Sequence, residues 1–224
     1  AGAEPRRGAA PADPRAVTAK LKICGVTRPV DLAVCVELGV DSIGINLWSG
    51  SRRGLSLAEA EALLRDVMPS RGGPERVGVF VNPGSDELQR AYEALELDLV
   101  QVIFDDAHAP SLPHTWVIRG TPSLESLRMP SPPPARVLLD AVAPGYGGAG
   151  LMTDWAWAGA AVPRFSVPVW LAGGITPENA AAALAAVAPA GLDVASGAEL
   201  AGAARGEKDR GKIAALLAAC RASR

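Results

Sequence analysis

The amino-acid sequence predicts an α/β fold, a single-domain (β/α)8 barrel or TIM barrel. Three observations support this prediction. Short apolar runs typical of strands alternate with longer helical patterns from residue 21 onward. The length of 224 residues suits one barrel and leaves little for a second domain. The glycine-rich turns come late in the chain, where barrels build phosphate sites, whereas an open doubly wound sheet has its phosphate loop after the first strand.

The first half of the chain carries distinct strand and helix signals. Pro29 suits the first turn of a helix. Ser56 is a typical helix cap, and Glu59 three residues later completes a capping box. In chain order we expect a strand at 21–24, a helix at 29–38, a strand at 42–47, a helix at 57–67, a strand at 76–81, a helix at 85–95 and a strand at 99–103.

The middle of the chain predicts shortened fourth and fifth βα units. Residues 105–114 are too rich in proline for a full helix, and only one helical turn is expected near 123–127. The remaining expected elements are strands at 115–118, 136–140, 169–171 and 192–194, a short helix from about Asp154, an alanine-rich helix that opens with Thr176-Pro177-Glu178, and a closing helix at 208–220.

The first twenty residues differ in composition from the rest. They are rich in Ala, Pro and Arg and show no apolar periodicity. We expect residues 1–20 to form a flexible N-terminal extension and residues 21–224 to form the barrel domain. An Arg-rich targeting leader is the alternative, although Glu4 and Asp13 are unusual in such a leader.

Charge and cysteine content argue against several classes of protein. The formal net charge of −2 gives no basic surface for nucleic acid. Apolar runs are interrupted by Pro, Gly or Asp before they could span a bilayer, so no membrane partner is expected. Cys24, Cys35 and Cys220 are an odd, widely spaced set, which argues against a disulfide framework and for a cytoplasmic location. No Cys and His spacing resembles a zinc site, so no metal is expected.

Two residues at predicted strand ends are candidates for acid–base chemistry. In a barrel, the end of each strand faces the active site. Cys24 closes the first strand and could act as a base or nucleophile if its pKa were lowered; the alternative is a small buried apolar residue. Asp140 closes the sixth strand after three apolar residues and could donate a proton if its pKa were raised; the alternative is a cap for the following loop.

Further polar and glycine-rich positions predict substrate binding. Arg52 and Arg53 follow the second strand, and one of them could pair with a carboxylate. Gly173-Gly174 and Ser196-Gly197 follow the seventh and eighth strands, where backbone N–H groups could approach a phosphate; ordinary tight turns are the alternative. A bulky residue at Gly174 is expected to weaken phosphate binding with little effect on stability.

Other polar residues are interpreted as structural. His108 and His114 lie in the proline-rich region and are expected on the surface. Asp193 lies within the eighth strand and is expected to orient the turn after it.

Taken in order, these segments resemble the phosphoribosylanthranilate isomerase family of tryptophan biosynthesis. The resemblance runs from residue 21 to about residue 220 and begins with KICGVT at 22–27. It departs from the family at Val102-Ile103-Phe104, where the family usually has Leu-His-Gly. The other matching segments are SRR at 51–53, VGVFVN at 77–82, VQ at 100–101, LLD at 138–140, GGAG at 147–150, DW at 154–155, LAGGI at 171–175, PEN at 177–179 and DVASG at 193–197.

The resemblance implies an Amadori rearrangement of N-(5-phosphoribosyl)anthranilate into a 1-deoxyribulose aminoketose. It implies that Cys24 is the base, Asp140 the acid and Arg53 the partner of the anthranilate carboxylate. The resemblance implies no metal or organic cofactor, and the expected partner is the phosphorylated sugar substrate. The chain is expected to be a monomer or homodimer. Another sugar-phosphate isomerase or epimerase, or a catalytically weak or silent phosphate-binding barrel, remains the alternative. The residues that the resemblance implies for the phosphate are Gly173, Gly174, Ser196 and Gly197.

Overall fold

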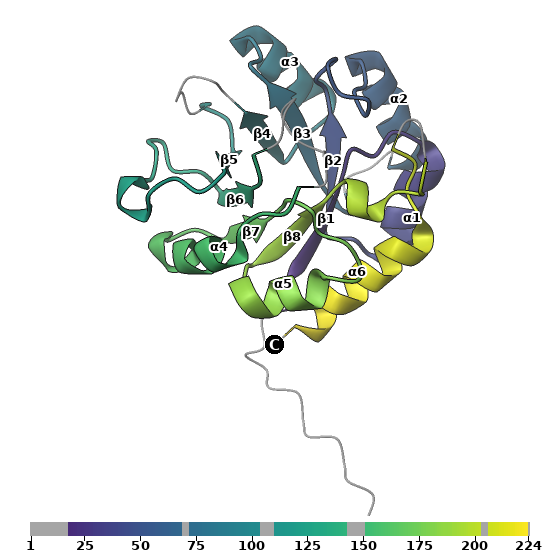
Figure 1. Cartoon of the computed structure of the whole chain (residues 1–224). Helices are drawn as coiled ribbons and strands as arrows, with labels where there is room; N and C mark the ends of the chain where they lie inside the picture. Colours follow the sequence, from purple (N-terminus) through teal and green to yellow (C-terminus); the bar gives the residue numbers. More distant parts are fainter. Residues whose placement is uncertain (1–17, 69–71, 104–109, 143–150, 203–205, 224) are drawn as a thin grey trace, which may run out of the picture.

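Eight parallel strands close into a barrel in which each strand pairs with its neighbours in chain order, and β8 (Gly191–Val194) pairs with β1 (Lys20–Cys24). The computed structural model describes residues 18–68, 72–103, 110–142, 151–202 and 206–223. Figure 1 shows the strands at the centre with helices outside them. The barrel prediction is therefore confirmed. The other strands are β2 (Ser42–Asn46), β3 (Glu75–Val81), β4 (Leu99–Ile103), β5 (His114–Arg119), β6 (Arg136–Asp140) and β7 (Val169–Leu171).

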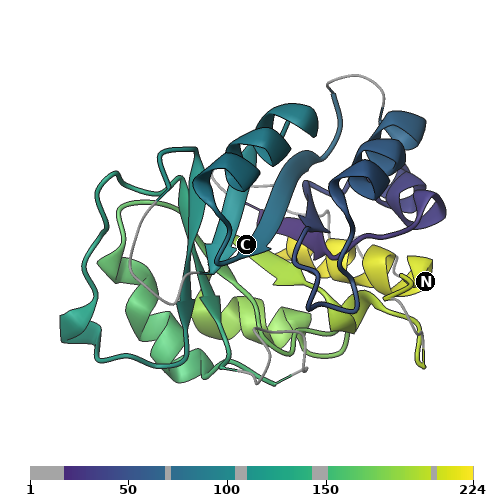
Figure 2. The same cartoon turned by 90° about the horizontal axis from the view of Figure 1, so that it is seen from above.

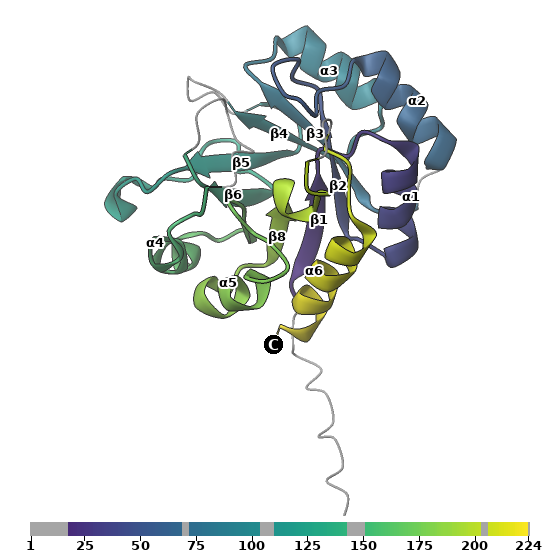
Figure 3. The same cartoon turned by 45° about the vertical axis from the view of Figure 1, so that its right-hand side comes forward.

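The helices form an incomplete outer layer. Helices α1 and α2, α4 and α5, α5 and α6, and α6 and α1 contact one another. Figure 2 shows this layer from above, and Figure 3 shows it with the right-hand side of Figure 1 brought forward and with irregular segments beside β5 and β6. The helices are α1 (Pro29–Leu38), α2 (Leu57–Val67), α3 (Ser85–Ala94), α4 (Trp155–Ala161), α5 (Ala180–Val187) and α6 (Arg210–Ala222), with 3-10 turns η1 (Leu124–Ser126), η2 (Val162–Arg164) and η3 (Ser196–Ala198).

Capping chemistry sets several helix boundaries. Pro29 is the first residue of α1, and Ser56 and Glu59 form the predicted capping box before α2. The closing helix begins at Arg210 rather than at Lys208, because the Asp209 side chain accepts from the backbone N–H of Lys212 at 3.0 Å and so caps the helix there. The other predicted bounds agree to within one or two residues except at α5.

Helix α5 begins later than predicted. The Asn179 side chain accepts from the backbone N–H of Thr176 at 2.8 Å and donates to the carbonyl of Gly174 at 2.8 Å. Residues 176–179 therefore form a turn, and the helix starts at Ala180.

The fifth βα unit is short, as predicted, because η1 is the only helical turn between β5 and β6 in the described chain. Residues 104–109 of the fourth unit lie outside the described residues, and 110–113 carry no helix. His114 is buried rather than on the surface, with its Nδ1 3.0 Å from the carbonyl of Leu112. His108 lies outside the described residues.

The N-terminal boundary lies slightly earlier than expected. Strand β1 begins at Lys20, inside the predicted extension, and residues 1–17 lie outside the described residues. Among the described helices, none has the length and apolar character required to span a bilayer.

The barrel interior contains charged side chains as well as apolar ones. Side chains alternate along a strand, so Lys22 and Cys24 of β1 point to the same side. Lys22 is paired in register with Asp193 of β8, and both side chains are buried. The apolar core lies mainly between the barrel and its helices, with Ile23, Ile43 and Leu192 fully buried. Because the apolar core lies between the strands and the helices, the polar side chains inside the barrel can form a site at the carboxyl ends of the strands.

Candidate active site

A cavity of about 340 Å³ opens at the carboxyl ends of the strands, a volume that suits a small molecule. The last residues of β1, β2 and β6, which are Cys24, Asn46 and Asp140, line it. The cavity therefore lies where the barrel fold predicts it. Of the predicted site residues, six line it, namely Cys24, Arg53, Asp140, Gly173, Gly174 and Ser196.

The thiol of Cys24 lies against the neighbouring strand. A Cβ at Gly44 of β2 would come within 2.8 Å of the Cys24 Sγ, so glycine leaves the space that the thiol needs. Burial raises the pKa of Cys24, and the positive charges of Lys22 and Lys208 oppose this rise. The resting thiol is therefore protonated near neutral pH, and the two lysines stabilise its thiolate when it forms.

The carboxyl group of Asp140 lies on the other side of the same cavity. Burial, with a second contribution from the negative charge of Asp193, raises the pKa of Asp140 to about 6. The backbone N–H of Ala141 donates to Asp140 Oδ1 at 2.8 Å and limits this rise. A carboxyl group with this pKa exists in both protonation states near neutral pH, as a proton donor must.

A buried ion pair lies at the floor of the cavity. Lys22 Nζ donates to Asp193 Oδ2 at 2.7 Å and to Gln101 Oε1 at 3.0 Å. Asp193 and Gln101 line the cavity, so Asp193 has more than the structural role expected from the sequence. The charge of Lys22 favours the Cys24 thiolate, whereas the charge of Asp193 favours protonated Asp140. The pairing joins residues at opposite ends of the chain, and no local sequence signal reports it.

Arg53 lines the cavity between the second strand and the end of the eighth. Its Nε donates to Glu199 Oε1 at 2.5 Å, and its Nη2 is buried with no partner among the described residues. Arg52 also pairs with Glu199, but its side chain is 45% exposed. Both arginines line the cavity, but only the Arg53 side chain is buried.

The two glycine-containing turns lie side by side at the ends of β7 and β8. Gly173 and Gly174 have φ angles of +85° and +65°. Within the described chain, the backbone N–H groups of Gly174, Ser196 and Gly197 donate to no protein acceptor. Gly197 does not line the cavity, because it packs so closely on Ile175 that a Cβ there would overlap the Ile175 carbonyl. Gly174 and Ser196 thus present backbone donors to the cavity that have no partner among the residues described.

One expectation about these turns needs correction. Residues Ser196–Ala198 form only a three-residue 3-10 turn, so backbone N–H groups rather than a helix field are what this turn offers an anion. A side chain at Gly174 would be strained by the φ angle of +65° and would lie 3.0 Å from the backbone of Met152. Substitution of Gly174 by Val is therefore expected to lower stability, contrary to the sequence-based expectation.

Two further features of the sequence bear on the site, namely the glycine-rich segment before α4 and the content of possible metal ligands. The glycine-rich segment 147–150 is not among the described residues. Among the residues that are described, no group of three or more His, Cys, Asp or Glu side chains could hold a metal ion.

Comparison with protein families gives one match over most of the chain. The family described as "N-(5'phosphoribosyl)anthranilate (PRA) isomerase" matches residues 21–219. The N-(5'-phosphoribosyl)anthranilate isomerase of Myxococcus xanthus is 36% identical over 218 residues, which cover 92% of this chain and 97% of that protein. The same enzyme of Thiobacillus denitrificans is 36% identical over 211 residues, covering 91% and 98%.

Solved structures give a consistent result. The phosphoribosyl anthranilate isomerase of Thermus thermophilus has a TM-score of 0.75 and 32% identity, covering 92% of this chain and 100% of that one. Another such isomerase, described in complex with reduced 1-(o-carboxyphenylamino)-1-deoxyribulose 5-phosphate, has a TM-score of 0.71 and 24% identity, covering 90% and 98%. At that identity the second structure supports the fold alone.

Proposed function

The chain belongs to the N-(5'-phosphoribosyl)anthranilate isomerase family, and we propose that Cys24 and Asp140 are the base and the acid of its reaction. The enzyme isomerises N-(5'-phosphoribosyl)anthranilate to 1-(2-carboxyphenylamino)-1-deoxyribulose 5-phosphate in tryptophan biosynthesis. The observation that carries the assignment is that a thiol and a carboxyl group of raised pKa line one cavity from two strand ends. Membership in this family excludes the alternative that the chain is another sugar-phosphate isomerase or epimerase.

The first step opens the sugar ring. Protonated Asp140 donates to the ring oxygen while the bond from C1 to that oxygen breaks, and the anilino nitrogen supplies the electron pair that forms the Schiff base. The Cys24 thiolate then removes the proton from C2, and those electrons form the enolamine. Loss of the proton from the C2 hydroxyl and gain of one at C1 give the ketone, so atoms and protons balance.

The two groups share one proton before the reaction. Near neutral pH the major form has an ionised Asp140 and a neutral Cys24 thiol, whereas catalysis uses the form with the proton moved to Asp140. The charge of Lys22 lowers the pKa of Cys24 and that of Asp193 raises the pKa of Asp140, which both favour the active form, whereas Asp193 also raises the pKa of Cys24 and Lys22 lowers that of Asp140. The pair at the floor of the cavity therefore acts on both protonation equilibria through its charges.

This proton sharing predicts the pH dependence of kcat/KM. The rate should fall below about pH 6, where Asp140 and Cys24 are both protonated and the thiolate is lost. It should fall again above the raised pKa of Cys24, where the acid is lost. Between these limits the proton count of the pair is constant, so a plateau is expected.

Asp193→Asn provides the check on the acid limb. Removal of its negative charge lowers the pKa of Asp140, so the acid limb should move to lower pH. The measurement is the profile of kcat/KM against pH for the wild type and this variant. An acid limb at the same pH in both proteins would contradict the role given to Asp193.

We further propose that the substrate phosphate binds at the ends of β7 and β8. The backbone N–H groups of Gly174 and Ser196 supply donors there without a side-chain charge, and Gly173 and Gly197 shape the two turns. Arg53 receives the anthranilate carboxylate through its guanidinium, whose buried Nη2 has no partner among the described residues. The competing arrangement would place the phosphate on Arg52 and Arg53.

Ser196→Asp should separate these two arrangements. A carboxylate at this position would repel a bound phosphate, because unit charges about 4 Å apart interact by roughly 4 kcal/mol at an effective dielectric constant near 20. We expect the affinity for inorganic phosphate to fall by at least about tenfold. Isothermal calorimetry with Ser196→Ala as the uncharged control checks this, and unchanged affinity in Ser196→Asp would place the anion elsewhere.

The remaining expectations concern the context of the enzyme. We infer a cytoplasmic monomer or homodimer, in keeping with the free cysteines Cys24, Cys35 and Cys220. A fold neighbour from Thermotoga maritima is described as a dimer from which monomers were generated. We propose that the extension expected from the sequence ends before Lys20, because Lys20 is the first residue of β1.

A further inference from the structure

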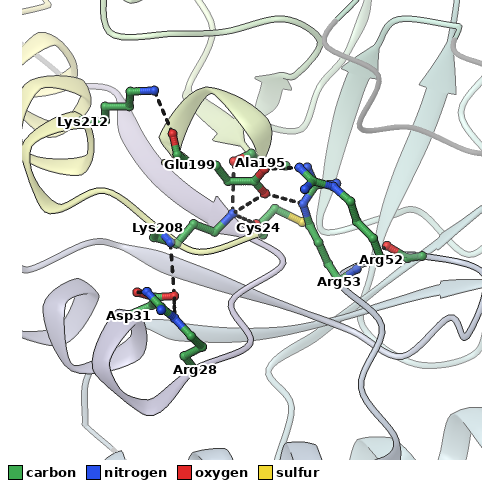
Figure 4. A network of polar contacts seen from close by, with 10 residues as sticks. Cys24, Arg28, Asp31, Arg52, Arg53, Ala195, Glu199, Lys208 and Lys212 are labelled. Carbon is green, nitrogen blue, oxygen red and sulfur yellow. Dashed lines mark hydrogen bonds and ion pairs between the residues drawn. The ribbon is translucent and has the colours of Figure 1, made fainter. Parts of the chain in front are cut away.

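Glu199 gathers three cationic side chains beside the cavity (Figure 4). Its Oε1 accepts from Arg53 Nε at 2.5 Å and from Lys208 Nζ at 3.3 Å, and its Oε2 accepts from Arg52 Nη2. The side chains of Glu199, Arg53 and Lys208 are buried, with exposed fractions of 5%, 7% and 1%. This cluster differs from a surface ion pair because water does not compete for its partners.

The stem of Arg53 is confined between two glycines. A Cβ at Gly25 would overlap Arg53 Cδ, and one at Gly206 would lie 3.0 Å from Arg53 Cγ. Both glycines have positive φ angles, +68° and +75°. The aliphatic part of the Arg53 side chain therefore has little freedom to move. The hydrogen bond from Nε to Glu199 then fixes the orientation of the guanidinium group. Nη2, which has no partner in the described chain, is the donor left over for a ligand.

The backbone of Glu199 is itself held in place. Glu199 and Lys208 form an antiparallel bridge, and Lys212 Nζ donates to the Glu199 carbonyl at 2.7 Å. Lys208 Nζ also donates to the carbonyls of Cys24 at 2.8 Å and Ala195 at 3.1 Å. Figure 4 shows these contacts converging on Lys208 from separate segments. The carboxylate that orients Arg53 is thus connected to the strand ends that carry the base and the phosphate turn.

The charges of the cluster do not cancel. Glu199 supplies one negative charge to two buried cations, Arg53 and Lys208, and to the partly exposed Arg52. Uncompensated positive charge in a buried site is unfavourable unless an anion arrives. A carboxylate bound to Arg53 would supply that anion, and the guanidinium could pair with it through the donors that Glu199 leaves unused.

We propose that Glu199 is a positioning residue that orients Arg53 for the carboxylate of the substrate. The proposal rests on the role of Arg53 in the proposed function. Glu199 does not touch the substrate, and it acts through the rotation of the Arg53 guanidinium. Its removal should therefore weaken binding of the carboxylate without slowing the chemical steps at Cys24 and Asp140.

The test uses Glu199→Gln, which keeps the shape of the side chain and removes its charge. We expect KM to rise about tenfold, as for the loss of a charge-assisted hydrogen bond, with kcat within about twofold of the wild type. Glu207→Gln is the matched control, because Glu207 precedes Lys208, pairs with Arg28 at 2.8 Å and does not line the cavity. This control should keep the wild-type KM.

Two binding probes show whether the effect passes through the carboxylate. Reduced 1-(o-carboxyphenylamino)-1-deoxyribulose 5-phosphate carries the carboxylate, and its phenylamino counterpart lacks it. Calorimetry should show about tenfold weaker binding of the first compound to Glu199→Gln and unchanged binding of the second. In an Arg53→Ala background, Glu199→Gln should cause no further loss, because the residue through which it acts is gone.

Several results would overturn the proposal. If Glu199→Gln bound both compounds equally more weakly, the substitution would have distorted the site in general. If Glu199→Gln lowered the affinity of Arg53→Ala for the carboxylate-bearing compound by a further tenfold, Glu199 would act independently of Arg53. Wild-type affinity of Arg53→Ala for the carboxylate-bearing compound would overturn the proposed role of Arg53 as well. If Glu199→Gln does not fold, Glu199→Asp keeps the charge but withdraws the carboxylate from Nε, and it should lose affinity only for the carboxylate-bearing compound.

Discussion

Cys24→Ser should abolish turnover while the barrel remains folded. A serine hydroxyl ionises far less readily than a thiol, so it cannot provide the base that removes the C2 proton. The change in volume is small, and Gly44 leaves space at this position. We expect kcat to fall by about a thousandfold or more, within the upper range for loss of a general base.

A second thiol serves as the control for this prediction. Cys35 is buried in helix α1 and does not line the cavity, and burial raises its pKa to about 12. Cys35→Ala should retain the wild-type kcat. Initial rates of the purified variants, with circular dichroism to establish folding, make the comparison. Wild-type kcat in a folded Cys24→Ser protein would remove Cys24 from the mechanism.

Asp140→Asn should also remove most activity. An amide cannot give the ring oxygen a proton in the way that a carboxylic acid can, and general acid catalysis contributes about 10²–10⁴-fold. The substitution keeps the size of the side chain. Asp154→Asn is a matched control, since Asp154 caps α4 by accepting from Trp157 N at 3.0 Å and asparagine caps as well. A loss below about tenfold in Asp140→Asn would point to a different acid.

The sequence predicted the architecture because its signals are local. Pro29, the Ser56 and Glu59 pair, and the apolar strand runs depend on residues only a few positions apart. The strand-end positions of Cys24 and Asp140 follow from those runs together with the barrel fold. The start of α6 was open to the same reasoning, because Asp209 is a recognisable cap, but the sequence pattern alone placed the start at Lys208.

The charged network could not be predicted because its partners are distant in the chain. Lys22 and Asp193 are 171 residues apart, and Arg53 and Glu199 are 146 apart. A lysine in a short strand gives no sign that it points into the barrel rather than to solvent. The interior position of Lys22 follows only once β1 and β8 pair and close the sheet. Closure also explains why Asp193 reaches the cavity.

The most direct test of the acid–base assignment is turnover of N-(5'-phosphoribosyl)anthranilate by the wild type, Cys24→Ser and Asp140→Asn, measured together with their affinities for the reduced product analogue. The assignment predicts rapid turnover by the wild type, a loss of about a hundredfold or more in each variant, and analogue binding close to that of the wild type in all three. Turnover above about a tenth of the wild-type rate in either folded variant would contradict it.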